Sequence, residues 1–494
     1  MRELVKTLLK KVGPGTMSEV AYDTAWMAML KEVDVELSNN ALNWLATHQL
    51  RDGSWGMEKP FDYHDRVINT LAAMVALTKY GRRAQDHAQI ERGMIALEKV
   101  TNKSFEQHLV DAGRATAAFE MLVPVLIEEA EKLGLITRQK ETILGQLSVY
   151  RQKKLELLNG NKISRSLSAA YAADMGGVDH GMDMLDLAQL QEGNGSIGHS
   201  PSATAYYILN FKSDDSAALA YLHKYATPNG GALDLAPFEV FEAVWVLWNL
   251  ALVKDWDEET KALIRPWLDY IKKGWKPGKG IGLSTGYSVP DGDDTSFAFS
   301  VLARFGDPLD IETILAFEEK DRFRTFHYEL NSSNSVNIHM LDALRESGMS
   351  ANAAPVQKIL KHLQTVRTQD TYWYDKWHIS PYYTTSHAII TCAGYADHVV
   401  EPAVSWILDT QHEDGSWGYQ FSSPEETAYC LQALFTWKKH GGKVPQAVLD
   451  RAVSWLKDHA APPYPPLWLG KGLFCADLIV ESAILSALIM AENE

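Results

Sequence analysis

The sequence has few cysteines and no long hydrophobic run. Its three cysteines, Cys392, Cys430 and Cys475, are an odd number at wide spacing, which argues against a disulfide framework or a zinc knuckle. No apolar segment approaches the roughly 18 residues of a transmembrane helix, and the N-terminus lacks the apolar segment and cleavage site of a signal peptide. These absences predict a reduced, cytoplasmic protein without a membrane span.

Positive charge is also in deficit. The chain has 47 Lys and Arg residues against 63 Asp and Glu residues, so its formal net charge is -16 at pH 7. Such a charge disfavours nucleic acid and anionic membrane surfaces as partners. Apolar residues make up 46% of the 494 residues, as is typical of a globular chain. The length and composition predict a globular protein of about two or three domains with a large core.

Two distant segments repeat one pattern. ALNWLATHQLRDGSWG (41–56) and AVSWILDTQHEDGSWG (403–418) share Ala-x-x-Trp, a Gln and Asp-Gly-Ser-Trp-Gly, and QEGNGSIG (191–198) is a weaker copy. Apolar residues recur at helical spacing on both sides, and Gly53 and Gly415 permit positive φ in the turn. The repeat predicts stacked helical hairpins in which the Gln side chain bridges backbone groups. Because no segment alternates convincingly like a strand, we expect an all-α fold.

The segment VPDGDDTSFAFS (289–300) places Asp291, Asp293 and Asp294 immediately before an apolar run. A solvated turn or a helix N-cap explains this pattern locally. A calcium loop does not, because the segment lacks a glutamate at the twelfth loop position. Clustered carboxyl groups in an apolar cavity have raised pKa values, so one of them can keep its proton at neutral pH and act as an acid.

The aspartate motif and the Gln…Asp-Gly-Ser-Trp-Gly repeats together resemble the class II terpene cyclases. Further blocks extend the likeness to class II diterpene cyclases over nearly the whole chain, among them AYDTAW (21–26), FEAVW (241–245), DKWHISPYYTT (375–385) and PPLWLGKGLFC (465–475). Within this family, the chain resembles the bacterial halimadienyl (tuberculosinyl) and kolavenyl diphosphate synthases. The resemblance implies two (α/α) barrel domains, called β and γ, with the active site between them.

The resemblance also places the domains. It implies a β domain of residues 1–25 and 236–494, which carries the aspartate motif, and an inserted γ domain of residues 26–235. A homodimer is compatible with this organisation. A protein prenyltransferase β-like subunit and a non-catalytic helical scaffold remain as alternatives. The first would need a zinc site, and an Asp-x-Cys ligand pair is missing from the sequence.

The implied activity is the cyclisation of geranylgeranyl diphosphate, begun by protonation, to a rearranged bicyclic diterpenyl diphosphate of halimadienyl or kolavenyl type. The product should keep its diphosphate, because the Asp-Asp-x-x-Asp metal motif of ionising class I synthases is absent. A copalyl (labdane-type) diphosphate synthase and a drimenyl-type cyclase acting on farnesyl diphosphate remain open. The stretch SRSLSAAYAADM (164–175) has no His where plant-type copalyl synthases hold a water base, which favours the rearranged skeleton.

Carried over residue by residue, the resemblance assigns the catalytic machinery. Asp293 is the general acid, Asp291 and Asp294 tune it, and Asn337 is its hydrogen-bond partner, although Asn337 could instead belong to a capped helix start. Aromatic faces stabilise carbocations by cation–π attraction. Three aromatic residues of one block are expected to line the cavity: Trp377, Tyr382 and Tyr383.

The substrate's diphosphate needs cations. The segment EKPFDYHDR (58–66) resembles the family's magnesium-associated motif, and its candidate ligands are Glu58, Asp62 and Asp65. Lysine acts as a point charge for phosphate, and the segment RQKKLELLNGNK (151–162) supplies three candidates: Lys153, Lys154 and Lys162. A solvated loop and a solvated helix face explain these two segments about equally well.

Overall fold

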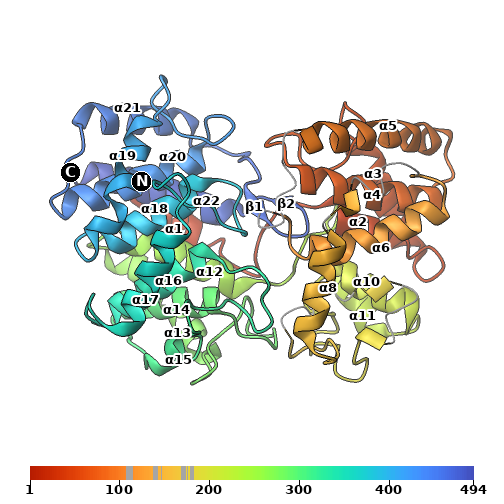
Figure 1. Ribbon diagram of the computed structural model, residues 1–494, viewed down its shortest axis with the longest axis horizontal. Helices are drawn as coiled ribbons and strands as arrows, with labels where there is room; N and C mark the ends of the chain where they lie inside the picture. Colours follow the sequence, from red (N-terminus) through yellow and green to blue (C-terminus); the bar gives the residue numbers. More distant parts are fainter. Residues whose placement is uncertain (107–114, 137–142, 146, 168–173, 175, 178–182) are drawn as a thin grey trace.

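The computed structural model describes residues 1–106, 115–136, 143–145, 147–167, 174, 176–177 and 183–494. Within this part of the chain, helices form two lobes that stand side by side (Figure 1). The helices and strands are α1 (Arg2–Leu9), α2 (Ala21–Ala28), α3 (Val35–Thr47), α4 (Tyr63–Tyr80), α5 (Ala84–Glu106), α6 (Phe119–Lys132), α8 (Leu147–Leu158), α10 (Pro201–Asn210), α11 (Ser216–Tyr225), α12 (Glu239–Ala251), α13 (Glu258–Gly274), α14 (Gly292–Arg304), α15 (Glu312–Leu315), α16 (Asn334–Glu346), α17 (Ala354–Thr365), α18 (Pro381–Cys392), α19 (Asp397–Asp409), α20 (Pro424–Lys439), α21 (Gln446–His459), β1 (Trp468–Leu469), β2 (Leu473–Phe474) and α22 (Asp477–Glu492).

Inner helices of the larger lobe close into a ring. In order around the ring they are α12, α14, α16, α18, α20 and α22, and α22 packs against α12. These helices are buried on almost every side, as α20 illustrates, where every residue from 425 to 436 is buried. The helices α1, α13, α17, α19 and α21 pack outside the ring. Outer helices such as α13 and α17 bury only one stripe of apolar residues, as expected of amphipathic helices. The larger lobe is therefore an (α/α) barrel.

The smaller lobe is built from the same kind of helical pairs. Its inner helices include α2, α4, α6 and α10, and α3, α5 and α11 pack against them from outside. The two hydrophobic cores divide the chain. One core joins buried residues from 5 to 20 with those from 240 to 489, and the other runs from 21 to 232. The division after residue 20 precedes the predicted boundary after residue 25, which would cut α2, a helix buried throughout in the smaller lobe.

The repeat turns hold neighbouring helices together. Gln49 Nε2 donates hydrogen bonds to Gly53 O and Gln89 O, both at 2.8 Å. Gln411 repeats this arrangement in the second copy. The φ angle of Gly53 is +96°, a conformation that glycine adopts readily. The Gln side chains therefore bridge backbone groups at helix ends, as the sequence predicts.

A short hairpin joins the two lobes. Strands β1 and β2 pair antiparallel, with Trp468 opposite Phe474, and lie between the lobes in Figure 1. Asp65 of α4 accepts a hydrogen bond from Leu473 N at 2.8 Å, which ties the hairpin to the smaller lobe. None of the helices described is both long enough and apolar enough to cross a membrane. The three cysteines are buried and unpaired.

Candidate active site

The aspartate motif forms the first turn of α14. Asp291 is the N-cap, and its Oδ1 accepts hydrogen bonds from the backbone N–H groups of Asp293 at 2.9 Å and Asp294 at 2.8 Å. The N-cap explanation of the sequence is therefore correct for Asp291. Gly292 lets a neighbouring loop approach closely, because a Cβ at this position would lie 2.4 Å from Arg324 O. This close packing fixes the position of the motif relative to the loop that contains Arg324.

Burial makes the three carboxyl groups unusually basic. It raises the pKa of Asp291 to about 7. Burial, together with the neighbouring Asp291 carboxylate, raises the pKa of Asp294 well above its ordinary value. Burial also raises the pKa of Asp293, although His339 opposes the shift. Because like charges in a desolvated site disfavour ionisation, the cluster retains protons at neutral pH.

Asp293 stands at the end of a chain of two histidines. Its Oδ1 lies 2.5 Å from His339 Nδ1, and His339 Nε2 lies 2.9 Å from His387 Nδ1. His387 Nε2 is buried, and no group in the described residues bonds to it. Burial lowers the pKa of His387 well below its ordinary value, and His339 adds to the effect, so His387 is neutral. A neutral imidazole has a single N–H, and placing it on Nδ1 avoids burying a donor without an acceptor.

This tautomer fixes the direction of every hydrogen bond in the chain. His387 Nδ1–H donates to His339 Nε2, and His339 Nδ1–H donates to Asp293 Oδ1. No hydrogen bond from the described residues reaches Asp293 Oδ2, and Asp293 lines the cavity between the lobes. In the protonated form of Asp293, the acid proton therefore sits on Oδ2. When it leaves, the His339 N–H stabilises the carboxylate that forms.

Asn337 does not contact Asp293, so the predicted partner role is wrong. Its Oδ1 accepts a hydrogen bond from Phe323 N at 2.9 Å, and its Nδ2 donates to Phe323 O at 3.0 Å and Ser333 O at 2.8 Å. The amide thus fastens a loop to α16. His339 lies two positions later, about 200° further around the helix. The available sequence signal was a histidine between the apolar residues Ile338 and Met340 of this helix.

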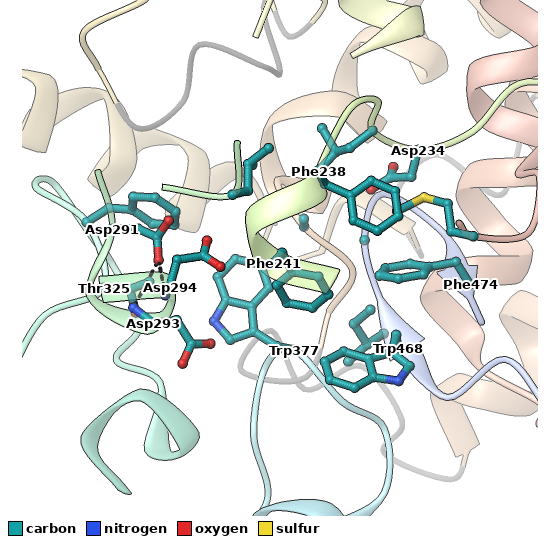
Figure 2. A pocket seen from close by; sticks show the side chains of 17 residues that line it. Asp234, Phe238, Phe241, Asp291, Asp293, Asp294, Thr325, Trp377, Trp468 and Phe474 are labelled. Carbon is teal, nitrogen blue, oxygen red and sulfur yellow. Dashed lines mark hydrogen bonds between the residues drawn. The ribbon is translucent and has the colours of Figure 1, made fainter. Parts of the chain in front are cut away.

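The acid faces a cavity between the two lobes (Figure 2). Six aromatic residues contribute to its wall: Phe238, Phe241, Phe326, Trp377, Trp468 and Phe474. The space free of protein atoms, counting the part that opens to solvent, is about 760 Å³. Aromatic faces around an apolar space attract cations by roughly 2 kcal/mol or more when desolvated.

Of the three predicted aromatic residues, only Trp377 lines the cavity. Tyr382 stacks on Trp406 of the outer helix α19, with ring centroids 4.7 Å apart. Tyr383 lies behind the wall, where its hydroxyl accepts a hydrogen bond from Trp245 Nε1 at 3.0 Å. Adjacent residues of a helix point about 100° apart, so Tyr382 and Tyr383 cannot share one face. Their predicted lining role is therefore wrong, and Trp468 and Phe241 are lining residues that sequence reasoning missed.

The three predicted lysines occupy different positions. Lys153 is exposed, with Nζ 5.5 Å from the ring centroid of Tyr150, and Lys162 is exposed beyond α8. Lys154 turns inward, with Nζ 3.9 Å from Glu120 Oε1. Burial lowers the pKa of Lys154, Glu120 opposes this shift, and Lys376 of the other lobe adds to it. Lys154 is therefore close enough to the larger lobe for the charge of Lys376 to affect its pKa.

Lys376 is a cation that the sequence analysis did not single out. It directly precedes the cavity residue Trp377, and its Nζ contacts Glu329 and donates to Asn331 O at 2.7 Å. Its charge acts on the pKa values of both Asp293 and Lys154. Lys376 and Lys154 are thus two cations from opposite lobes that act on each other electrostatically, and Lys376 directly precedes a lining residue of the cavity. The available sequence signal was a lysine inside the block DKWHISPYYTT.

The predicted magnesium ligands do not gather. Glu58 is exposed, and Asp62 caps α4 by accepting from Asp65 N at 2.8 Å. Asp65 Oδ1 accepts from Leu473 N and Oδ2 from Met57 N, both at 2.8 Å. Over the described ranges, no three His, Cys, Asp or Glu residues could together hold a metal ion. Both oxygens of Asp65 are thus occupied by backbone N–H groups, so the three candidate ligands do not form a preformed site, and the magnesium assignment stays a prediction.

Comparisons with known proteins agree with this geometry. Residues 329–441 match the squalene-hopene cyclase C-terminal domain. The chain is 43% identical to the type B diterpene cyclase of Mycobacterium tuberculosis (strain ATCC 25618 / H37Rv), with 99% of each chain covered. It is 28% identical to the ent-copalyl diphosphate synthase of Streptomyces sp. (strain KO-3988), covering 97% of this chain and 93% of the other.

A solved structure shows the same fold. The ent-copalyl diphosphate synthase from Streptomyces platensis superposes with a TM-score of 0.79 at 26% identity, with 99% of each chain covered. The predicted fold class, two helical barrels of the terpene cyclase type, is thereby confirmed. The match to the mycobacterial enzyme spans both lobes of the chain. The chain belongs to the class II (type B) diterpene cyclases.

Proposed function

We propose that this enzyme cyclises geranylgeranyl diphosphate to a rearranged bicyclic diterpenyl diphosphate of halimadienyl or kolavenyl type and leaves the diphosphate attached. The observation that carries the proposal is the position of Asp293, a buried carboxyl group with a raised pKa that contacts His339 at the wall of a cavity lined by aromatic residues. An acid so placed protonates an alkene. The Asp-Asp-x-x-Asp motif that ionises a diphosphate is absent from the sequence.

The first step uses the free oxygen of Asp293. The Oδ2–H bond breaks, the proton bonds to the terminal alkene of the substrate, and the alkene's remaining carbon becomes a tertiary cation. An alkene is a very weak base, so the acid must be activated at the moment of transfer. The His339 N–H strengthens its bond to Oδ1 as negative charge develops there, which favours the transition state over the ground state.

The cation then moves through the ring system. Electron pairs of the following double bonds close two rings, and the aromatic wall stabilises the charge at each stage. Hydride and methyl shifts carry the charge around the bicycle when no base acts early. In support, the stretch 164–175 contains no His. Residues 168–173 and 175 of this stretch lie outside the described part of the chain. Identity to the mycobacterial type B cyclase, at 43%, also exceeds identity to the Streptomyces copalyl synthase, at 28%.

Magnesium fits this enzyme as a companion of the diphosphate rather than as an ion in a preformed carboxylate cage. Asp62 and Asp65 are engaged by backbone N–H groups. Glu58 is exposed and can contribute one oxygen. Magnesium is commonly held by one or two carboxylates together with phosphate oxygens and water. When bound, it neutralises part of the diphosphate charge beside Lys154 and Lys376.

Removing either lysine should weaken substrate binding. We expect Lys154→Gln and Lys376→Gln each to raise KM about 10-fold or more, because each deletes a charge-assisted contact of about 1.5–3 kcal/mol. The value of kcat should change little, since the diphosphate contact is the same in the ground and transition states. Lys153→Gln is the matched control, because Lys153 adjoins Lys154 but points to solvent. A normal KM in both inward variants would contradict the anchoring role.

The proposed function predicts a product that stays in water until it is dephosphorylated. Purified enzyme with geranylgeranyl diphosphate and magnesium should yield an extractable diterpene alcohol only after phosphatase treatment, and chelation should suppress turnover. A hydrocarbon released without phosphatase would contradict retention of the diphosphate. NMR of the alcohol separates a rearranged skeleton from an unrearranged labdane, and faster turnover of farnesyl diphosphate would favour the drimenyl alternative.

A further inference from the structure

The cavity has a second charged end. Asp234 lines it on the side away from the acid, and Figure 2 shows Asp234 across the aromatic wall from Asp291, Asp293 and Asp294. Asp234 is only 1% exposed. The aromatic and aliphatic side chains between the two ends offer no carboxylate. Asp234 is therefore the one acidic residue among the lining residues outside the aspartate motif, in the part of the chain that the structure describes.

The two oxygens of Asp234 have different surroundings. Its Oδ1 accepts a hydrogen bond from Lys471 N at 3.1 Å and lies 3.4 Å from the Lys471 ammonium. Its Oδ2 receives no hydrogen bond from any described residue. A Cβ at Gly470 would lie 2.1 Å from Oδ2, so this oxygen rests against Gly470, which itself lines the cavity. Asp234 Oδ1 is therefore bound by the hairpin, whereas Oδ2 lies beside the cavity and is available to accept a proton.

Behind Asp234 lies a buried network with an excess of carboxylates. Lys471 Nζ donates to Asp234 O at 2.8 Å and to Ser200 Oγ at 2.7 Å, and it lies 2.9 Å from Asp23 Oδ1. Burial alone would lower the pKa of Lys471, but Asp23, Asp234 and Asp174 raise it above its ordinary value. Three carboxyl groups thus surround one ammonium that stays charged. The network therefore holds Lys471 in place beside Asp234, whose Oδ2 remains next to the cavity.

Given the proposed cyclisation, we infer that Asp234 is the base that ends the reaction. A C–H bond beside the last cation breaks, and its electron pair forms the new C=C bond. The proton goes to Asp234 Oδ2. Each turnover then consumes the Asp293 proton and protonates Asp234, and exchange with water resets both groups. The Lys471 contact on Oδ1 orients the carboxylate so that Oδ2 faces the substrate.

Asp234→Asn tests this role because it keeps the shape of the side chain and an acceptor for Lys471 N while removing the basic oxygen. We expect substrate to be consumed still, but the share of the native alkene to fall at least about 10-fold, in line with the loss of a general base. Alkene isomers and water-quenched alcohols should replace it. These products are separated by gas chromatography and mass spectrometry after phosphatase treatment.

Asp23→Asn is the matched control, since Asp23 contacts the same Lys471 but does not line the cavity. Its product spectrum should stay native. Equal shifts in both variants, or a native spectrum at the native rate in Asp234→Asn, would overturn the inference. So would complete loss of substrate consumption in a folded Asp234→Asn protein, because that places the defect before the last step.

Gly470→Ala keeps the test decisive if Asp234→Asn fails to fold. The added Cβ displaces Asp234 Oδ2 and changes no charge. A shift in products toward isomers and alcohols supports the inference, and a native spectrum overturns it. Wild-type enzyme that consumes no geranylgeranyl diphosphate at all would instead refute the proposed function, which separates the two failures.

Discussion

Asp293→Asn should lower turnover by at least about 10³-fold, the scale of a general-acid contribution when no other proton source is available. The amide keeps the size of the side chain and an oxygen that can accept from His339 Nδ1–H, whose present contact with Asp293 Oδ1 is 2.5 Å. It cannot supply an acidic proton to an alkene. Steady-state kinetics with geranylgeranyl diphosphate, followed by phosphatase and product quantification, measure the loss.

The neighbouring aspartates provide the comparison. Asp291→Asn and Asp294→Asn should lower activity without abolishing it, because both residues affect Asp293 indirectly. They act through the electrostatic coupling of the three carboxyl groups and through the N-cap that Asp291 provides for α14. Circular dichroism and the thermal unfolding midpoint should show that Asp293→Asn is folded. If that folded variant turned over near the wild-type rate, the acid would have to lie elsewhere.

Removing the imidazole of His339 should have the second largest effect. His339→Leu deletes the donor to Asp293 Oδ1 and should lower kcat about 10²-fold, within the range for support of a proton transfer. His339→Asn has nearly the same shape as leucine but carries an amide donor close to the position of Nδ1. We expect this variant to recover part of the loss. Comparison of the two variants separates the effect on kcat of losing the hydrogen bond from the effect of altered packing in α16.

The pH profile distinguishes a positioning role for His339 from a purely structural one. The reactive form of Asp293 is protonated, so activity falls as pH rises through its pKa. Burial raises this pKa, and His339 opposes the shift by stabilising the carboxylate. Without His339 the pKa rises further. The alkaline limb of kcat should therefore move to higher pH in His339→Leu although its maximum falls, and an unmoved limb would argue against the role.

Local features of this protein were accessible from sequence alone. Helical periodicity and the Asp-Gly-Ser-Trp-Gly turns predicted an all-α fold of stacked hairpins, since both signals act over a few residues. The same holds for the cap at Asp291 and for the raised pKa values that follow from crowding three aspartates before an apolar run. The resemblance then connected these features to a cyclase, and the full-length relatives established the family.

The tertiary structure decided which side chains meet. A shift of two positions along α16 exchanges Asn337, which holds a loop, for His339, which holds the acid. The next link, His387, comes from a different helix, and a single step along α18 separates Tyr382 from Tyr383. These outcomes depend on the rotation of each helix about its axis, which packing of the whole barrel sets.

Contacts between residues that are far apart in the sequence depend even more on the complete tertiary structure. Asp65 meets the backbone of Leu473, and Lys471 meets both Asp23 and Asp234, across long stretches of intervening sequence. The sequence by itself therefore determined the helical repeats, the acid motif and the family. Helix packing within the larger barrel decided the partner of the acid. The docking of two barrels around one hairpin decided the cation pair and the carboxylate at the far end. Those contacts depend on the relative placement of whole elements, which no local pattern records.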